Sequence, residues 1–173
     1  MHPFPIFSSV QIAKRVDELG LAIAQTIEPG PILVVGVLRG AFIFMADLVR
    51  AIPRDVSCDF LRVRSYGTGS ISSGKVELLQ DLSTSIREYH VLLIEDIIDT
   101  GLTIKWLKEL LEPRQPRSLR VCSLLDKPSH RLVPTMVDFI GFEVPDRFVV
   151  GYGLDYNEQY RNLAYIGAID PLP

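Results

Sequence analysis

The sequence predicts an α/β fold with a largely parallel central sheet. Short apolar, β-branched runs recur along the 173 residues and alternate with segments of helical periodicity, which is typical of strand–helix–strand units. Polar residues follow three of these runs, namely Arg39, Asp99 and Lys127. Because ligands bind beyond the carboxyl ends of parallel strands, we expect these three side chains to face one crevice.

The first half of the chain predicts two helices and three strands. Ser8 and Gln11 have capping-box spacing, and apolar residues follow at helical intervals until Ile27, before Pro and Gly end the helix. The next expected elements are a strand over 32–38, a helix over 41–50, a strand over about 56–63 and a short strand over 76–79. The stretch 65–74 consists mainly of Gly, Ser and Thr and can bury little, so we expect a mobile loop there.

The second half continues the alternation. A buried strand over 91–94 leads through two carboxylates and a small-residue turn to a helix over 105–111, which Pro113 and Pro116 end. Further strands are expected over 119–125, 139–144, 148–151 and 165–169. No repeat or linker divides the chain, and its length suits one core, so we expect a single domain over 1–173.

Composition excludes several classes of protein. Charged residues make up 23% and hydrophobic residues 47% of the chain, and the net charge of −3 argues against a surface for non-specific nucleic-acid binding. We see no signal peptide and no membrane-length apolar run, so we expect a cytoplasmic protein without membrane contact. Cys58 and Cys122 lie in apolar segments without metal-site spacing, and we expect two buried free thiols.

The most specific pattern is the run from Val91 to Ile104, in which a strand leads through Glu95, Asp96 and Asp99 into a turn and a helix. Such a unit brings free backbone N–H groups and a positive dipole end to one point, which suits an anion. The paired acids suit a vicinal diol or Mg²⁺, because hydroxyls donate to carboxylates and Mg²⁺ takes oxygen ligands. A phosphate, a diol and a metal at one loop describe a phosphorylated sugar.

This run resembles the 5-phosphoribosyl-1-pyrophosphate (PRPP) loop of the type I phosphoribosyltransferases. A solvated acidic turn that caps a helix is the alternative reading, and the acidic pair of a phospho-acceptor receiver domain would follow the first strand instead. Further segments are similar to the bacterial-type hypoxanthine (hypoxanthine-guanine) phosphoribosyltransferases of this family, namely 36–41, 64–67, 124–127 and 145–158. The resemblance implies the type I fold, with a mostly parallel sheet flanked by helices, a small hood formed by terminal segments and a flexible lid loop.

The resemblance also implies a reaction and a set of site residues. The reaction transfers 5-phosphoribosyl from PRPP to hypoxanthine, and to guanine, with Mg²⁺ as cofactor. It assigns ribose and 5-phosphate binding to Glu95, Asp96, Asp99, Thr100, Gly101, Leu102 and Thr103, with Asp99 also the catalytic base. It assigns pyrophosphate binding to Arg39, Gly40 and Arg161, and purine binding to Lys127, Phe148, Val149 and Asp155. The metal ligands would be Glu95, Asp96 and Asp155, and the lid would carry Ser65 and Tyr66.

Each implied role has a physical reason. Neutralised pyrophosphate leaves more readily, so Mg²⁺ and arginine side chains belong beside it. An aspartate such as Asp99 is ionised at neutral pH and can take the purine proton. Lys127 can donate to a 6-oxo group but cannot accept from the amino group of adenine. A lid that carries Ser65 and Tyr66 would exclude water, which is the competing nucleophile.

Several questions stay open at the level of sequence. A PRPP-binding regulator of the same fold is one alternative, although the pI near 5.6 and the lack of an added basic module disfavour it. A relative that prefers xanthine or guanine is another. We expect a homo-oligomer, either a dimer or a tetramer, and the sequence does not decide whether the Leu38–Arg39 peptide is cis. His2, His90 and His130 have no triad or metal spacing, so we expect surface or structural roles for them.

Overall fold

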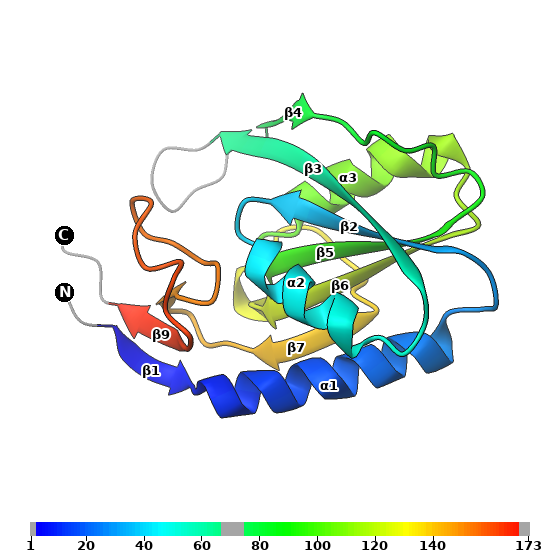
Figure 1. Cartoon of the computed structure of the whole chain (residues 1–173). Helices are drawn as coiled ribbons and strands as arrows, with labels where there is room; N and C mark the ends of the chain where they lie inside the picture. The colour runs from blue at the N-terminus through cyan, green and yellow to red at the C-terminus, as the bar shows by residue number, and fades with distance from the viewer. Residues whose placement is uncertain (1–2, 67–74, 170–173) are drawn as a thin grey trace.

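Six strands form a sheet through the middle of the molecule, in the order β4-β3-β2-β5-β6-β7 (Figure 1). The computed structural model describes residues 3–66 and 75–169, without the side chains of residues 65, 66 and 75. The strands of this sheet are β2 (Ile32–Leu38), β3 (Val56–Tyr66), β4 (Lys75–Gln80), β5 (His90–Ile98), β6 (Ser118–Asp126) and β7 (Phe139–Glu143). All neighbouring pairs run parallel except β3 and β4, so the predicted α/β fold with a mostly parallel sheet is confirmed.

Helices cover both faces of the sheet. The helices are α1 (Ser9–Thr26), α2 (Phe42–Ala51) and α3 (Leu102–Leu111), with short 3₁₀ turns η1 (Glu112–Arg114) and η2 (Pro128–His130). α1 and α2 share one apolar cluster with Val34 and Leu92, whereas α3 packs in a second cluster with Leu33 and Leu93. Since alternate residues of β2 and β5 face opposite clusters, both central strands are buried on two faces, which explains their continuous apolar sequences.

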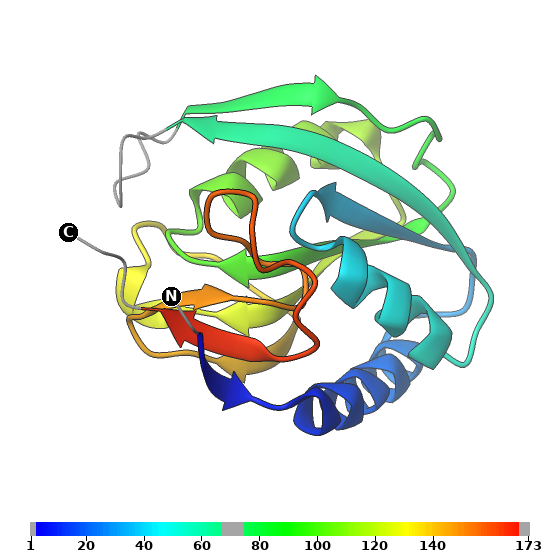
Figure 2. The ribbon, with the colours of Figure 1, turned by 60° about the vertical axis from the view of Figure 1, so that its left-hand side comes forward.

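A second, three-stranded sheet forms the expected hood. It consists of β1 (Phe4–Phe7), β9 (Ile166–Ile169) and β8 (Phe148–Val150), in that order and with antiparallel pairing. Figures 1 and 2 show that this sheet brings the two ends of the described chain together, beside the carboxyl ends of the central strands. Within the described residues, no helix is long and apolar enough to cross a membrane.

Most predicted elements are confirmed to within a few residues. The strand over 32–38 has the predicted bounds, and α1 begins with the predicted capping box, in which Gln11 N donates to Ser8 Oγ and Ser8 N donates to Gln11 Oε1. The sequence did not predict β1, η1 or η2, which are too short to show a period.

Three expectations need correction. β3 continues past 63 to Tyr66, because its backbone pairs with β4 as far as Tyr66 and Lys75; the rest of the expected loop, 67–74, lies outside the described residues. β5 does not end at 94 but continues to Ile98, because β6 pairs with it along this whole length. Cys122 is a buried free thiol as expected, but Cys58 is free and exposed, because it lies on the outward face of β3 beside exposed Phe60.

Gly20 marks the closest approach of α1 to α2. A Cβ on Gly20 would lie 2.3 Å from the carbonyl oxygen of Ala51, which is a backbone atom and cannot move alone. Alanine favours a helix interior over glycine by about 1 kcal/mol. We nevertheless expect Gly20→Ala to lower the free energy of unfolding by about 1–3 kcal/mol, because overpacking outweighs helix propensity.

Urea denaturation measures this effect, with Leu21→Ala as the neighbouring control. Leu21 is 54% exposed, and its truncation should change the free energy of unfolding by no more than about 0.5 kcal/mol. A Gly20→Ala variant as stable as the original chain would show that α1 and α2 do not need this close contact.

Candidate functional site

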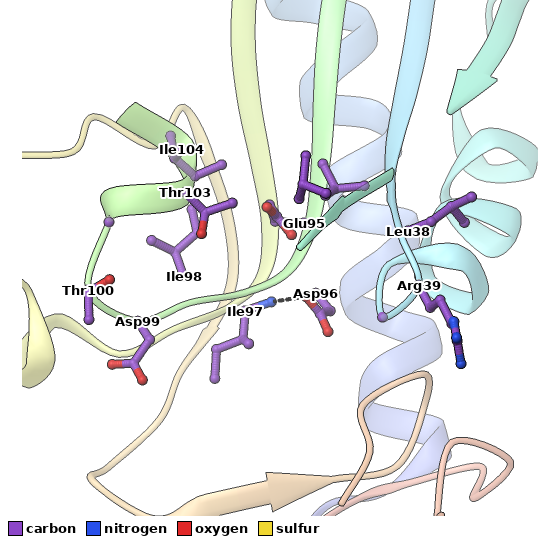
Figure 3. A pocket seen from close by; sticks show the side chains of 14 residues that line it. Leu38, Arg39, Glu95, Asp96, Ile97, Ile98, Asp99, Thr100, Thr103 and Ile104 are labelled. Carbon is purple, nitrogen blue, oxygen red and sulfur yellow. Dashed lines mark hydrogen bonds between the residues drawn. The ribbon is translucent and has the colours of Figure 1, made fainter. Parts of the chain in front are cut away.

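The candidate site lies beyond the carboxyl ends of β2 and β5, where the chain forms a cavity of about 240 Å³ (Figure 3). One wall comes from the turn after β2, with Arg39 and Gly40, and the other from the end of β5 and the start of α3. The predicted residues that line this cavity are Arg39, Gly40, Glu95, Asp96, Asp99, Thr100, Gly101 and Thr103. Of the three side chains expected at one crevice, Arg39 and Asp99 line this cavity, whereas Lys127 lines an adjoining one.

The N-terminus of α3 lies at one end of the cavity. Gly101 precedes the helix with φ +84, a left-handed conformation that glycine adopts without strain. A Cβ at this position would also lie 2.2 Å from Thr135 Oγ1. α3 begins at Leu102, so its first N–H groups and the Thr103 side chain lie at the cavity, where the helix dipole favours negative charge.

Glu95 and Asp96 are carboxylates held inside the end of a buried strand. Glu95 is only 6% exposed, and burial raises the pKa of its carboxyl well above the usual range, with the adjacent Asp96 charge acting in the same direction. Burial also raises the pKa of Asp96, although the Ile97 N–H, 2.9 Å from Asp96 Oδ1, acts in the opposite direction (Figure 3). A cation or hydroxyl donors at this point would offset that unfavourable burial of charge.

The turn after β2 lies directly against Asp96. A Cβ on Gly40 would lie 1.7 Å from Asp96 Oδ2, so only glycine allows this approach. The Leu38–Arg39 peptide of the turn is cis, which answers the question that the sequence leaves open. Arg39 is half exposed, and its Nη1 lies 2.7 Å from Glu158 Oε2.

A group of charged side chains from the segment after β8 closes the site near Asp96. Arg161 Nη2 lies 2.8 Å from Asp155 Oδ1, and the Arg161 guanidinium also donates to the carbonyl oxygen of Gly153. The Arg161 charge lowers the pKa of Asp96 and the Asp155 charge raises it, so both groups act on that carboxylate. Arg161 does not line the first cavity; it lies with Arg39 and Glu158 at an adjoining cavity beside Leu38.

These acids fit a Mg²⁺ ion that is shared with a substrate. Among the described residues, no three His, Cys, Asp or Glu side chains form a closed metal cluster. Mg²⁺ does not need one, because it is commonly held by one or two carboxylates together with water and substrate phosphates. Glu95 and Asp96, whose carboxyl pKa values are raised by burial, provide such a partial set of ligands together with Asp155, whose charge acts on Asp96.

A further cavity, of about 230 Å³, adjoins the first and shares Asp96 and Asp99 with it. All four residues that the sequence analysis assigned to purine binding line this cavity, namely Lys127, Phe148, Val149 and Asp155. Lys127 follows β6 and its side chain is 9% exposed, with Nζ 3.6 Å from Asp146 Oδ1. The Phe148 ring is 41% exposed and meets Tyr156 edge-on, with the ring centres 5.3 Å apart, so one face of Phe148 is open to a flat ligand.

His130 is the site residue that sequence reasoning missed. Its Nδ1 lies 3.0 Å from Asp99 Oδ1 and its Nε2 lies 2.8 Å from Asp146 Oδ1, and the sequence pattern did not indicate these contacts. The available signal was its position three residues after Lys127, in the same turn beyond β6. His90 is buried beside Ser118, as a structural histidine would be.

Two predictions for this region concern residues that the structure does not describe. His2 lies outside the described residues, and so do the side chains of the lid residues Ser65 and Tyr66. The backbones of Ser65 and Tyr66 belong to the end of β3, where they pair with Val76 and Lys75. Their part in covering the site therefore stays a prediction.

Comparison with known proteins identifies this arrangement. Residues 6–157 match the model of the phosphoribosyl transferase domain. The chain is 49% identical to a hypoxanthine-guanine phosphoribosyltransferase of Bacillus subtilis, over 96% of this chain and 92% of that protein. It is 46% identical to a hypoxanthine phosphoribosyltransferase of Haemophilus influenzae, over 97% and 96% of the two chains.

A solved structure agrees with these sequence comparisons. A hypoxanthine phosphoribosyltransferase from Staphylococcus aureus superimposes with a TM-score of 0.92 at 42% identity, covering 96% of this chain and 91% of that one. The fold, the matched length and the level of identity all indicate the same family. The chain belongs to the phosphoribosyl transferase family and, within it, to the hypoxanthine and hypoxanthine-guanine phosphoribosyltransferases.

Proposed function

We propose that this chain transfers the 5-phosphoribosyl group of PRPP to hypoxanthine or guanine, which gives IMP or GMP and pyrophosphate. The observation that carries this proposal is the pair of adjoining cavities that share Asp96 and Asp99. One cavity contains a helix N-terminus and buried acids, and the other contains a buried lysine and an open aromatic face. A ribose at the junction would place its 5-phosphate in the first cavity and a purine in the second.

The first cavity binds and orients PRPP. Backbone N–H groups at the start of α3, with the hydroxyls of Thr100 and Thr103, receive the 5-phosphate. Glu95 and Asp96 accept hydrogen bonds from the ribose hydroxyls. Glu95, Asp96 and Asp155 would hold Mg²⁺, which would supply charge neutralisation for the pyrophosphate.

The two arginines act on the leaving group. Arg39 and Arg161 both contact Glu158 Oε2, at 2.7 and 3.3 Å, so a single carboxylate keeps both guanidinium groups at the same rim. Pyrophosphate oxygens replace this carboxylate as ligands of the arginines. As the bond between C1 of the ribose and pyrophosphate breaks, these cations stabilise the charge that the leaving group gains.

The second cavity selects and activates the base. Lys127 donates to the 6-oxo group, Phe148 stacks on the ring, and the backbone of Val149 meets the edge of the pyrimidine ring. A purine nitrogen forms the new bond to C1, and the Asp99 carboxylate accepts the proton that the purine loses. Adenine has an amino donor in place of the oxo group, which leaves Lys127 without an acceptor.

The oligomeric state, the single-domain organisation and the cellular location of the protein stay predictions. Both apolar clusters pack on one central sheet, which supports a single domain over the described residues. Phe42 and Phe60 are exposed around an open cavity next to Arg39, which supports a homo-oligomer, either a dimer or a tetramer. Light scattering measures the mass in solution and distinguishes a dimer from a tetramer. The cytoplasmic location is an expectation from the sequence alone.

Product formation from single bases tests the proposed function. The purified protein is incubated with PRPP, Mg²⁺ and hypoxanthine, guanine, xanthine, adenine or uracil, and the nucleotide is quantified by chromatography. We expect IMP and GMP but no nucleotide from adenine or uracil, and the ranking with xanthine gives the preferred base. No product from any base, with PRPP still bound, would instead indicate a PRPP-binding regulator.

Asp99→Asn tests the general base. The amide cannot take a proton, so kcat for IMP formation should fall by about 10²–10⁴-fold, while folding and PRPP binding are preserved. Steady-state kinetics and PRPP titration measure both effects. Asp17→Asn on the exposed face of α1 is the control and should leave kcat unchanged. An unchanged kcat in Asp99→Asn would remove this residue from the mechanism.

Lys127→Ala tests the reading of the 6-oxo group. The KM for hypoxanthine should rise, or kcat/KM fall, by at least about tenfold, because the carbonyl loses its charged donor, whereas PRPP affinity should change by less than about twofold. Lys105→Ala is the matched control, because the Lys105 side chain is exposed on the surface of α3. Equal losses in hypoxanthine use and PRPP affinity would mean that Lys127 supports the fold of the site rather than reading the base.

Glu95→Gln tests how much the burial of an ionisable Glu95 carboxyl lowers folding stability at high pH. The raised pKa of Glu95 means that the folded state holds a proton which the unfolded chain has already lost, so stability falls as pH rises above about 4.3, the ordinary glutamate pKa. Gln carries no such penalty. With EDTA present, we expect Glu95→Gln to melt at least about 3 °C higher than the original chain at pH 8, and the difference to vanish near pH 4.

Exposed Glu109→Gln on α3 is the control, and its melting temperature should follow the original chain at both pH values. Despite its greater stability, Glu95→Gln should lose most of its activity. A variant that melts at a lower temperature at pH 8 would show that Glu95 stabilises the free protein, contrary to the charge penalty argued here.

A further inference from the structure

We propose that His130 is a positioning residue of the transfer reaction, which holds Asp99 through its Oδ1 atom and is itself held by Asp146. The proposal deepens the proposed function and rests on it, since it takes Asp99 to be the base. His130 comes from η2, Asp99 from the connection between β5 and α3, and Asp146 from the connection between β7 and β8. One side chain therefore joins three segments that meet at the purine cavity.

His130 lies beside the Asp99 side-chain oxygen that has no hydrogen-bond partner among the described residues. Asp99 Oδ1 is a buried atom for which no hydrogen-bond partner is found among the described residues. His130 Nδ1 lies 3.0 Å from this oxygen, which is within ion-pair distance. The two atoms do not have the geometry of a hydrogen bond in this structure. A small rotation of either group would complete the bond, as is common when catalytic groups tighten on substrate binding.

The backbone around His130 is fastened to the same connection as Asp99. Arg131 Nη1 donates to the carbonyl oxygen of Asp99 at 3.0 Å, and the Leu132 N–H donates to the carbonyl oxygen of Thr100 at 2.9 Å. Arg131 is in turn paired with the buried carboxylate of Asp126 at the end of β6. The ring of His130 therefore keeps its place relative to the Asp99 carboxylate.

The second ring nitrogen is occupied as well. His130 Nε2 lies 2.8 Å from Asp146 Oδ1, and donation from His130 is the main reason that the pKa of Asp146 is lowered. The other charges near the ring are Lys127, whose Nζ lies 3.6 Å from the same Asp146 oxygen, and the adjacent Arg131. With Asp146 accepting at Nε2, a neutral ring would present no proton to Asp99, whereas the imidazolium donates to both carboxylates.

This arrangement has a consequence for Asp99. A donor on Oδ1 fixes the plane of the carboxylate, which leaves Oδ2 to accept the purine proton. Removing the donor would leave the carboxylate free to rotate away from the line of proton transfer. Because misplacement by about 1 Å can lower a rate by about 10²-fold, the effect should appear in kcat rather than in PRPP binding.

Two conservative variants separate this role from a purely structural one. In His130→Asn the amide nitrogen lies close to the place of Nδ1 and can donate to Asp99, whereas in His130→Gln it reaches toward the place of Nε2 and can donate to Asp146. If orientation of Asp99 is the function of His130, asparagine should restore activity and glutamine should not. If His130 only fastens the segment that carries Asp146, the order should be reversed.

The experiment measures kcat for IMP formation and KM for PRPP in the full chain with Mg²⁺. We expect His130→Ala to lower kcat by about 10–100-fold with the KM for PRPP within about twofold, and His130→Asn to regain at least half of that loss on a logarithmic scale. Leu132→Ala, two residues along and 65% exposed, is the control and should match the original chain. A kcat within about twofold in His130→Ala, or equal recovery with glutamine, would overturn the proposal.

A double variant separates this inference from the proposed function. Since His130 acts through Asp99, adding His130→Ala to Asp99→Asn should lower kcat by less than about twofold beyond the single Asp99 variant. A further loss as large as that in the original background would show that His130 acts independently of Asp99, which overturns the inference alone. An original chain that makes no nucleotide would instead refute the proposed function.

Discussion

The burial of two adjacent carboxylates at the end of β5 is the constraint on which the rest of the structure depends. Glu95 and Asp96 lie in a strand flanked by β2 and β6 and covered on both faces; Glu95 is only 6% exposed, and Asp96 is half-buried. Burial accordingly raises the pKa of both carboxyls. The fold thus places two acids where their ionisation is unfavourable, and a cation or ribose hydroxyls bound there would offset that cost.

The charged side chains near Glu95 and Asp96 are paired with one another. Arg39 and Arg161 share Glu158, Arg161 also holds Asp155, and Lys127 and His130 share Asp146. These ion pairs are partly exposed, so each contributes little to stability. These ion pairs hold the cationic side chains beside the cavities, where the proposed function requires them.

How well the sequence predicts each part depends on how local its cause is. The bounds of β2 follow from an apolar run buried on two faces, and the loop before α3 is recognisable because its acids, its small-residue turn and the helix after it lie close together in the sequence. The continuation of β3 to Tyr66 and of β5 to Ile98 depends on pairing with β4 and β6, which strand-like composition does not show. The exposure of Cys58 depends on which face of β3 is covered, and the contacts of His130 depend on three segments meeting in space.

The most direct test of the whole account is a crystal structure of the chain with PRPP, Mg²⁺ and an unreactive hypoxanthine analogue. The account predicts the 5-phosphate at the N-terminus of α3, the ribose hydroxyls on Glu95 and Asp96, and the 6-oxo group within hydrogen-bond distance of Lys127 Nζ. It also predicts that Asp99 faces a purine nitrogen. A purine ring bound away from Lys127 and Asp99, or a phosphate bound away from residues 100–103, would contradict it.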